Sequence, residues 1–368
     1  DLQTRQEIYQ TGKDKYTLNP FKEAEIQITR KGLILAKTDK DTYEISEDQF
    51  NCLTGDKVKI RITDFNQKKG TIKEVLNRKG TPAEVKIENG KKYAIVRNKE
   101  NETKYELKTD ENLVDGILIG IKLEKNRKDK QPVATLDRIF GHKNRPRLDE
   151  EIILYENNFN YEWPEEVKKE LKYIPSEVSE EDKKGRRDLR NIEIFTIDGD
   201  DTKDIDDAIS LDKLENGNYL LGVHIADVAN YVKEGTAIDK ESYERATSVY
   251  MNTVVNPMYP VELSNGICSL NPETDRLAMT AEMEINPKGK VVNYDIFESV
   301  IHSRKQMTYK NVNKILNDEE VPEGYEPFQN KLKEMYELSK ILKKNRQNRG
   351  YQEFQTSEIK VVTDENGI

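Results

Sequence analysis

Six aspartates fall within ten consecutive residues of this chain, from 198 to 207, and this cluster most constrains how the chain can fold. Apolar, strand-like runs flank it at 192–197 and 219–225. Carboxylates crowded at the end of a sheet repel one another and raise each other's pKa, so the local fold needs a compensating cation. Mg²⁺ suits this role because a few carboxylates and phosphate oxygens bind it. The cluster therefore predicts a metal-dependent site that cleaves phosphodiester bonds.

The spacing of the aspartates predicts how they share a site. In an extended segment Asp204 and Asp206 point to one face and Asp207 to the other. A turn through Gly199 would bring Asp198 back against these three. Up to four carboxylates would then surround one point. Phosphodiester hydrolysis uses such an arrangement, often with two ions about 3.5–4 Å apart.

Other interpretations of the cluster are weaker. An EF-hand loop that starts at Asp198 would need Gly and Glu where Lys203 and Ile209 stand, so it is excluded. A helical pyrophosphate-binding motif would need helix-forming flanks, and the flanks here are Ile, Phe, Thr and Val. An acidic surface loop stays possible in so charged a chain. Apolar neighbours such as Phe195 and Ile205 argue against it, because they indicate burial.

Composition narrows the class of protein. Charged residues make up 35% of the chain, and no apolar run is long enough for a membrane span or reads as a signal peptide. Cys52 and Cys268 give neither a disulfide framework nor a metal-binding spacing, which indicates a reducing cytoplasm. With three histidines, His142, His224 and His302, a zinc site or a Ser-His-Asp triad is improbable. A net charge of −9 argues mildly against a nucleic-acid coat protein.

The order of elements predicts a multidomain chain: two N-terminal OB-fold-like β-barrels followed by an α/β (α+β) catalytic domain. Short strands broken by Gly and Asp recur in two series, each typical of a small antiparallel barrel. The expected divisions are a tail at 1–15, a first barrel at 16–80, a second at 81–143, a linker at 144–187 and the catalytic domain from 188 to 368.

The two barrels look like a weak internal repeat of about 60 residues, in which Gly55 and Gly116 each precede a late strand. OB barrels bind single strands with a basic groove and stacked aromatics, whereas plain spacer barrels are the alternative. The candidate stacking residues are Tyr43, Phe50, Tyr93 and Tyr105.

Three helices are predicted in the second half of the chain. One covers 164–171 within the linker. Thr308 caps another, and Pro327 opens a longer one that Gly350 ends.

Several separated motifs, in order, resemble the ribonuclease II/ribonuclease R family of exoribonucleases and cover most of 190–368. They are IDGDDTKDIDDA at 197–208, LGVHIADVANYV at 221–232, ATSVY at 246–250, ELSNGICSLNP at 262–272, DRLAMT at 275–280 and NRG at 348–350. The tandem barrels are similar to the two cold-shock-type domains of that family. The resemblance implies processive 3′→5′ hydrolysis of single-stranded RNA, release of nucleoside 5′-monophosphates, and Mg²⁺ as cofactor.

The resemblance also implies which carboxylates act. The metal-binding and water-organising residues would be Asp198, Asp204, Asp206 and Asp207, with Asp206 nearest the reacting phosphate. Asp200 and Asp201 match variable positions of the motif and are left out of the site.

Three aromatic residues gain a role from the resemblance. Tyr250 and Phe354 match a pair that clamps the 3′-terminal bases, and Tyr309 matches a tyrosine beside the channel floor. Stacking holds any base, whereas without the resemblance each would be an ordinary core aromatic. We expect His224 to be a satisfied core histidine, and Arg276 to pair structurally rather than bind phosphate.

The chain departs from the family pattern at both ends. It begins at Asp1, without the N-terminal helical domain of many ribonuclease R proteins, and it ends at Ile368, before a later arginine, further acidic residues and a C-terminal barrel that the resemblance implies. We therefore expect a fragment, more like ribonuclease R and truncated within the catalytic domain, that is inactive or very weak alone.

The leading hypothesis is an exoribonuclease that is a monomer, binds single-stranded RNA and has no membrane association. The alternative is a non-catalytic RNA-binding protein with an idle nuclease-like domain. Concentrated negative charge facing phosphate favours the enzyme. A DNA nuclease is disfavoured by the resemblance alone. Whether structured RNA is degraded, and with one metal or two, stays open.

Overall fold

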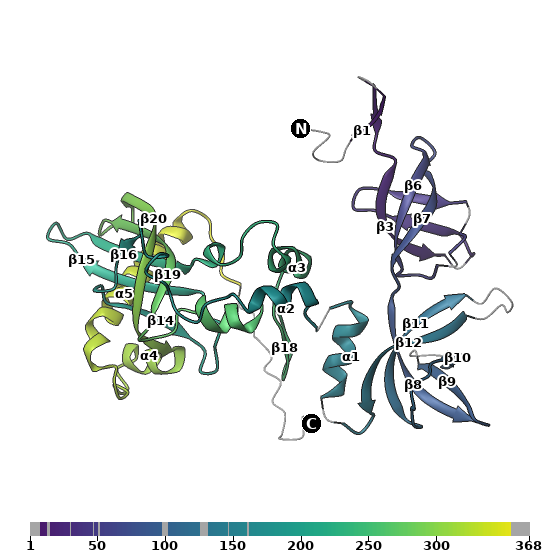
Figure 1. Cartoon of the computed structure of the whole chain (residues 1–368). Coiled ribbons are helices and arrows are strands. Elements are labelled where there is room, and N and C mark those ends of the chain that lie inside the picture. Colours follow the sequence, from purple (N-terminus) through teal and green to yellow (C-terminus); the bar gives the residue numbers. More distant parts are fainter. Residues whose placement is uncertain are drawn as a thin grey trace. The chain divides into compact units, whose positions relative to one another are not determined.

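The computed structural model describes residues 8–354 except for 13–14, 30, 47, 51, 98–101, 126–131, 146 and 160–161. The chain divides into two compact units. Among the described residues, the first comprises those up to 159 with 251–254, and the second comprises 162–250 with 255–354. No helix of the described residues is long and apolar enough to cross a membrane. Each unit is built on a closed arrangement of strands (Figure 1).

The first unit begins with two paired strands and a closed five-stranded barrel. The pair is β1 (Ile8–Gly12) with β2 (Lys15–Leu18), and the barrel strands are β3 (Phe21–Ile28), β4 (Ile34–Lys37), β5 (Thr42–Ile45), β6 (Lys57–Asp64) and β7 (Lys69–Asn77). Their order around the barrel is β3-β4-β5-β7-β6. Strict alternation builds it: in β6, Val58, Ile60 and Ile62 are buried and the lysines and arginine between them are exposed.

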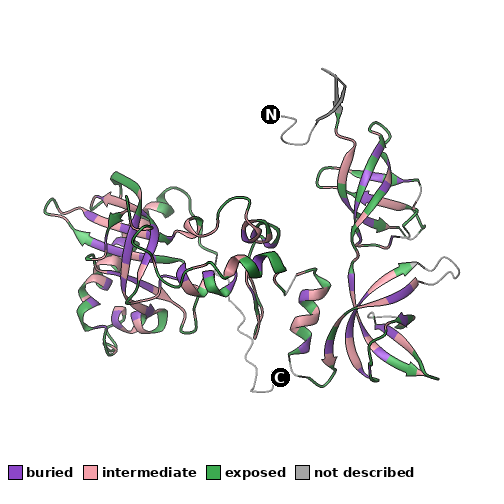
Figure 2. Ribbon diagram, viewed as in Figure 1, coloured by how far each residue is buried: buried purple, intermediate pink, exposed green. Residues whose placement is uncertain are grey.

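A second closed barrel follows in the same unit. Its strands are β8 (Gly80–Glu88), β9 (Lys91–Arg97), β10 (Glu102–Lys108), β11 (Ile117–Lys125) and β12 (Pro132–His142). Its order, β8-β9-β10-β12-β11, repeats that of the first barrel. Figure 2 shows buried positions along the strands of both barrels. The expectation of two N-terminal OB-like barrels followed by an α/β domain is therefore confirmed.

The weak repeat in the sequence corresponds to one backbone device used twice. Gly55 (φ 94°) precedes β6, the fourth strand of its barrel, and Gly116 (φ 81°) precedes β11, the fourth strand of the other. The N–H of Gly55 donates to the carbonyl of Ile26 at 2.8 Å, and that of Gly116 to the carbonyl of Val85 at 2.9 Å. Both positions need a residue that tolerates positive φ, which explains the shared glycine.

Some elements were not predicted. The sequence patterns missed β7 and β10, and the hairpin β1–β2 lies partly in the expected tail. Among the candidate stacking residues, the prediction for Tyr43 is wrong: its side chain is buried in the barrel core, because β5 alternates exposed and buried positions and Tyr43 falls on the inner face. Tyr105 also packs against a core, whereas Phe50 is exposed.

An unpredicted helix, α1 (Leu148–Glu156), lies in the expected linker and closes the second barrel. Its Tyr155 stands over two glycines on the paired strands β8 and β11: Gly80, which lies opposite Lys122, and Gly120, which lies opposite Pro82. The Tyr155 hydroxyl donates to Asp137 at 2.8 Å, and its ring meets Phe140 edge-on at 5.2 Å. A Cβ on Gly120 would lie 2.5 Å from Cζ of Tyr155, so the glycines form a socket for the ring.

The second unit is organised by one very long strand. Its strands are β13 (Arg187–Asp188), β14 (Ile194–Asp198), β15 (Asp207–Lys213), β16 (Tyr219–Ala226), β19 (Asp275–Ile285) and β20 (Val291–Thr308), in the order β13-β20-β14-β15-β16-β19. The first part of β20 pairs with β19 and its last part with β14. Strands β14, β15, β16, β19 and β20 are therefore paired around a closed circuit.

Helices complete the second unit. They are α2 (Glu165–Leu171), α3 (Ala237–Arg245), α4 (Tyr309–Leu316) and α5 (Gln329–Asn348), with short segments η1 (Val228–Asn230), η2 (Glu262–Ile267) and η3 (Glu326–Phe328) and the hairpin β17 (Val249–Tyr250) and β18 (Val255–Asn256). As predicted, Thr308 caps α4: its hydroxyl accepts the N–H of Asn311 at 3.2 Å. Both α4 and α5 pack over β14 and β15 (Figure 1).

His224 is a satisfied core histidine, as expected. It is 1% exposed, and its two ring nitrogens lie 3.1 Å from the Ser210 hydroxyl and 2.9 Å from the Thr280 hydroxyl. Burial lowers the pKa of His224 to about 4, so the ring is neutral near neutral pH.

Gly120→Ala should destabilise the second barrel by about 1–3 kcal/mol, because the new methyl group collides with the Tyr155 ring in a packed site. Hydrogen exchange of β8 and β11 peptides would measure the loss. Adding Tyr155→Leu should recover part of it, since leucine lacks the outer ring atoms. Equal exchange in the wild type and Gly120→Ala would contradict the socket.

Candidate active site

The acidic segment connects two neighbouring strands of the closed circuit. Asp198 is the last residue of β14 and Asp207 the first residue of β15, and these strands run antiparallel with Phe195 opposite Ile209. Asp198 also lies opposite Thr308, the last residue of β20. The ends of three strands therefore meet at the aspartates.

The backbone of this segment is held from several sides. A turn at 199–202 is closed by the N–H of Thr202, which donates to the Gly199 carbonyl at 3.3 Å. The Gln306 amide donates to the Thr202 carbonyl at 3.0 Å. The Asp206 carbonyl accepts the N–H of Ala226 at 2.9 Å. The expected turn through Gly199 is present, and it returns the chain toward Asp198.

Ser269, a buried residue just after η2, clamps the same segment. Its hydroxyl accepts the N–H of Ile205 at 3.1 Å and donates to the Lys203 carbonyl at 2.8 Å, so it holds the peptide groups on both sides of Asp204. Ile205 is fully buried, and its carbonyl accepts the N–H of Leu270 at 2.9 Å. Ser269 lies in the motif at 262–272, but nothing in the sequence indicated that it would contact the acidic segment.

Arg276 supports this clamp from behind and has the structural role that we expected. It is 7% exposed, and its Nε donates to the Ser269 carbonyl at 2.8 Å. Its other nitrogens donate to the carbonyls of Asp275 and Gly266. All three bonds go to backbone oxygens, so Arg276 fixes the loop after η2.

The aspartates act on one another electrostatically. Burial raises the pKa of Asp198, and the charges of Asp207, Asp204 and Asp206 raise it further. Asp206 is exposed, yet partial loss of water around its carboxylate raises its pKa, with the charges of Asp204 and Asp207 adding to the effect. Each of the four carboxylates therefore belongs to one interacting group.

The donor set fits a hard divalent cation. Asp198 Oδ2 is buried and has no hydrogen-bond partner among the described residues, and neither has the hydroxyl of the fully buried Thr196 two residues earlier. Burial raises the pKa of Asp198, but the Thr196 hydroxyl nevertheless lies close enough to lower that pKa in part, and a divalent cation would satisfy the buried oxygen further. In the described part of the chain no three Asp, Glu, His or Cys side chains converge into a closed metal-binding cluster. The four-aspartate metal site thus remains a prediction.

The three aromatic candidates are placed differently. Tyr250 ends β17 with its ring 61% exposed, and its hydroxyl donates to Asp204 Oδ2. Tyr309 is 60% exposed and directly follows Thr308, whose backbone lies opposite Asp198. Phe354 is exposed, and among the described residues no ring contact joins it to Tyr250. Tyr250 is thus joined to the acidic segment by a hydrogen bond, and Tyr309 follows a residue that pairs with Asp198, whereas no hydrogen bond or ring contact joins Phe354 to this segment among the described residues.

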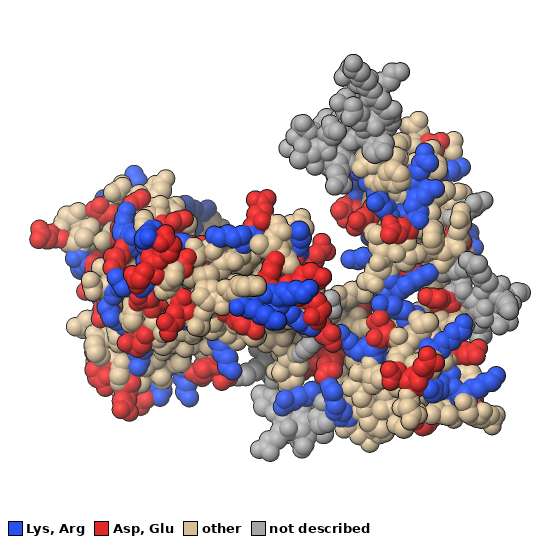
Figure 3. All heavy atoms as spheres, viewed as in Figure 1, with Lys and Arg blue, Asp and Glu red and all other residues tan. Residues whose placement is uncertain are grey.

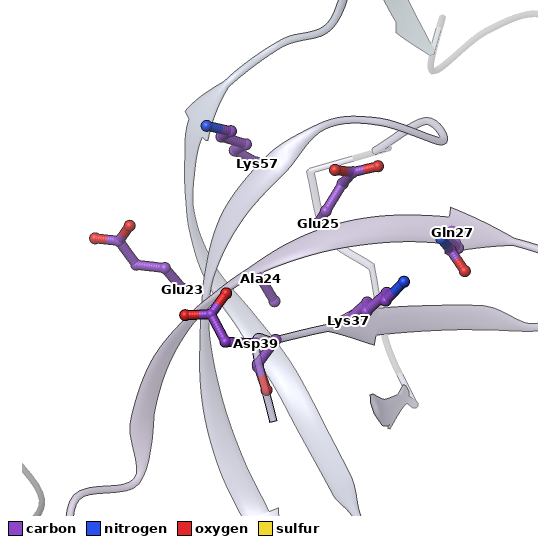
Figure 4. A pocket seen from close by; sticks show the side chains of 8 residues that line it. Glu23, Ala24, Glu25, Gln27, Lys37, Asp39 and Lys57 are labelled. Carbon is purple, nitrogen blue, oxygen red and sulfur yellow. The ribbon is translucent and has the colours of Figure 1, made fainter. Parts of the chain in front are cut away.

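On one face of the described residues, the basic side chains do not form a single patch. Figure 3 shows Lys and Arg interspersed with Asp and Glu on the face in view. A hollow of about 430 Å³ on the first barrel has three carboxylates, Glu23, Glu25 and Asp39, and two ammonium groups, Lys37 and Lys57 (Figure 4). Its slight negative excess disfavours a phosphate backbone at this place.

Two closed barrels followed along the chain by a closed α/β sheet with an acidic loop form a multidomain architecture that known proteins share. The model of the RNB domain matches residues 186–368. Ribonuclease R of Thermotoga maritima is 40% identical over 356 residues, which are 93% of this chain and 50% of that relative. The chain thus spans about half the length of the curated relative.

Solved structures show the same fold. RNase R of Mycoplasma genitalium, in complex with ribose-methylated single-stranded RNA, aligns with a TM-score of 0.73 at 24% identity, over 94% of this chain and 56% of that one. Yeast Ssd1, a pseudonuclease, aligns with a TM-score of 0.59 at 15% identity, over 89% of this chain and 48% of that one. The chain belongs to the ribonuclease II/ribonuclease R (RNB) family and is similar to ribonuclease R. Nucleases of this family generally depend on a divalent metal.

In metal-free buffer at pH 7, Asp198→Asn should stabilise the protein by up to about 1 kcal/mol, the scale of one partly solvated charge interaction. The folded-state pKa of Asp198 lies above its unfolded value, so ionisation costs stability as pH rises through this interval. The gain should therefore shrink below the ordinary aspartate pKa of about 4. Thermal unfolding in EDTA at several pH values measures it.

Asp200→Asn is the matched control, because Asp200 is exposed in the same loop. It should change the melting temperature less than Asp198→Asn. A lower melting temperature for Asp198→Asn at pH 7 would contradict the charge repulsion.

Proposed function

We propose that this chain provides the RNA-binding barrels and the acidic site of a Mg²⁺-dependent, processive 3′→5′ exoribonuclease that hydrolyses single-stranded RNA to nucleoside 5′-monophosphates. The carrying observation is the 198–207 segment of an RNB domain, where burial and the charges of Asp207, Asp204 and Asp206 raise the pKa of Asp198. The metal and catalytic residues of this proposal are Asp198, Asp204, Asp206 and Asp207.

The chemistry follows from the charges. Bound Mg²⁺ would neutralise phosphate and lower the pKa of a bound water. Asp198 and Asp206, whose pKa values are raised in the metal-free protein, would hold the cation as carboxylates. The clamp at Ser269 and the bond to Ala226 keep the backbone of Asp204 and Asp206 in place against mutual repulsion. Positions are thus set before substrate arrives, which favours catalysis.

Substrate binding is assigned to aromatic side chains and to the barrels. Tyr250, Tyr309 and Phe354 are exposed, as stacking on bases requires. Both barrels have the strand order of OB folds, which commonly bind single-stranded nucleic acid. The RNase R relative of known structure was solved with single-stranded RNA, which supports the same class of partner here. We also propose that the protein is a monomer and works in the cytoplasm. The free, buried thiols of Cys52 and Cys268 are compatible with a reducing compartment.

The fold likeness to a pseudonuclease supports a second candidate, an RNA-binding protein with an idle nuclease domain. The aspartates distinguish the two. A binding surface gains nothing from clustered carboxylates that repel phosphate, so retention of all four favours the enzyme.

Asp206→Asn in the full natural protein that carries this chain should reduce RNA hydrolysis by more than about 100-fold, since even outer-shell partners of metal ligands contribute 10–100-fold. The assay follows a 5′-labelled single-stranded RNA with Mg²⁺ or EDTA. The wild type should give a Mg²⁺-dependent ladder that shortens from the 3′ end.

Asp200→Asn, in the same loop, is the control variant and should retain the ladder. The 368-residue chain is assayed beside the full protein, and we expect it to be inactive or very weak. RNA binding without shortening by the wild-type full protein would overturn the exonuclease and favour the idle domain.

A further inference from the structure

Tyr250 meets the acidic site through its hydroxyl and not through its ring. It ends β17 and lies opposite Val255 in the β17–β18 hairpin. The ring is 61% exposed and free to receive a base, whereas the hydroxyl donates a hydrogen bond to Asp204 Oδ2. The ring of Tyr250 thus faces solvent, whereas its hydroxyl contacts Asp204.

Asp204 depends on this bond for its orientation. Its flanking peptide groups are fixed by Ser269, so its backbone position is set. Among the described residues, Tyr250 is the donor that forms a hydrogen bond with the Asp204 carboxylate. Rotation of the carboxylate about its own side-chain bonds is therefore controlled by Tyr250.

The chemistry of this pair suits a metal ligand and its support. One carboxylate oxygen of Asp204 accepts a hydrogen bond from the phenol hydroxyl, and the other oxygen remains available to a cation. Carboxylates that bind metals are regularly oriented by such outer hydrogen bonds. A tyrosine phenol is protonated at physiological pH, so it can serve as the donor in this bond.

We propose that the Tyr250 hydroxyl is a positioning group that orients Asp204 for the divalent cation, separately from any stacking of the Tyr250 ring on RNA. This inference rests on the proposed function, because it assumes that Asp204 binds the cation. It adds a metal-ordering role to a residue otherwise expected to hold a base.

Tyr250→Phe separates the two roles, because it removes the hydroxyl and keeps the ring. In the full natural protein, Mn²⁺ affinity measured by electron paramagnetic resonance without RNA should fall about 10-fold or more. Affinity for single-stranded RNA in EDTA should stay unchanged. Tyr250→Ala removes both parts and should weaken Mn²⁺ and RNA binding together.

Tyr243→Phe is the matched control, since Tyr243 is 81% exposed on α3 of the same unit. It should leave Mn²⁺ affinity unchanged. If the wild type binds Mn²⁺ and degrades RNA but Tyr250→Phe binds Mn²⁺ equally well, the positioning role is wrong while the nuclease stands. If the wild type neither binds Mn²⁺ nor degrades RNA, the proposed function itself fails.

Discussion

Repulsion among the carboxylates at the end of β14 is the constraint on which this part of the molecule depends. The charges of Asp204 and Asp207 raise the pKa of both Asp198 and Asp206, and an unrestrained loop would let these carboxylates move apart. The fold prevents this by fixing backbone atoms. The peptide groups of the segment bond to Ser269, Gln306 and β16, so the chain cannot relax by moving away. Instability is thereby held at the site where a cation can relieve it.

The architecture around the loop follows from the same need. Three strand ends meet at the aspartates because β20 is long enough to pair first with β19 and then with β14. A short strand would serve only one neighbour. The closed circuit therefore restricts movement of β14 and β15. Helices α4 and α5 pack on one face of these two strands and form apolar cores with it. Arg276 adds three backbone bonds behind the Ser269 loop. Rigidity reaches the loop from packing on several sides rather than from the loop's own sequence.

Sequence patterns predicted those features that depend on residues close together along the chain. The alternation of apolar and polar residues, together with turn residues, predicted most barrel strands and the repeat. Thr308, a residue type that commonly caps helices, predicted the start of α4. The acidic motif located the site because its residues are adjacent along the chain. Patterns failed where distant residues decide. Tyr43 was predicted to lie on a binding face, but its side chain is buried in the barrel core. Helix α1 was missed because its sequence is only weakly amphipathic, and its Tyr155 packs against glycines of two different strands. Ser269 lies 64 residues from Ile205, so no spacing rule joins them. Domain limits and site roles remain predictions.

Tyr250 shows why such a site is assembled from separate segments. A carboxylate that must bind a cation needs one oxygen free and one held, and its own strand cannot supply that donor without crowding the loop further. A tyrosine on a neighbouring hairpin supplies it from outside and keeps its ring for another partner. A donor such as lysine would also neutralise charge that the cation is needed to neutralise. The neutral phenol orients Asp204 and leaves the negative charge of the cluster available to the metal.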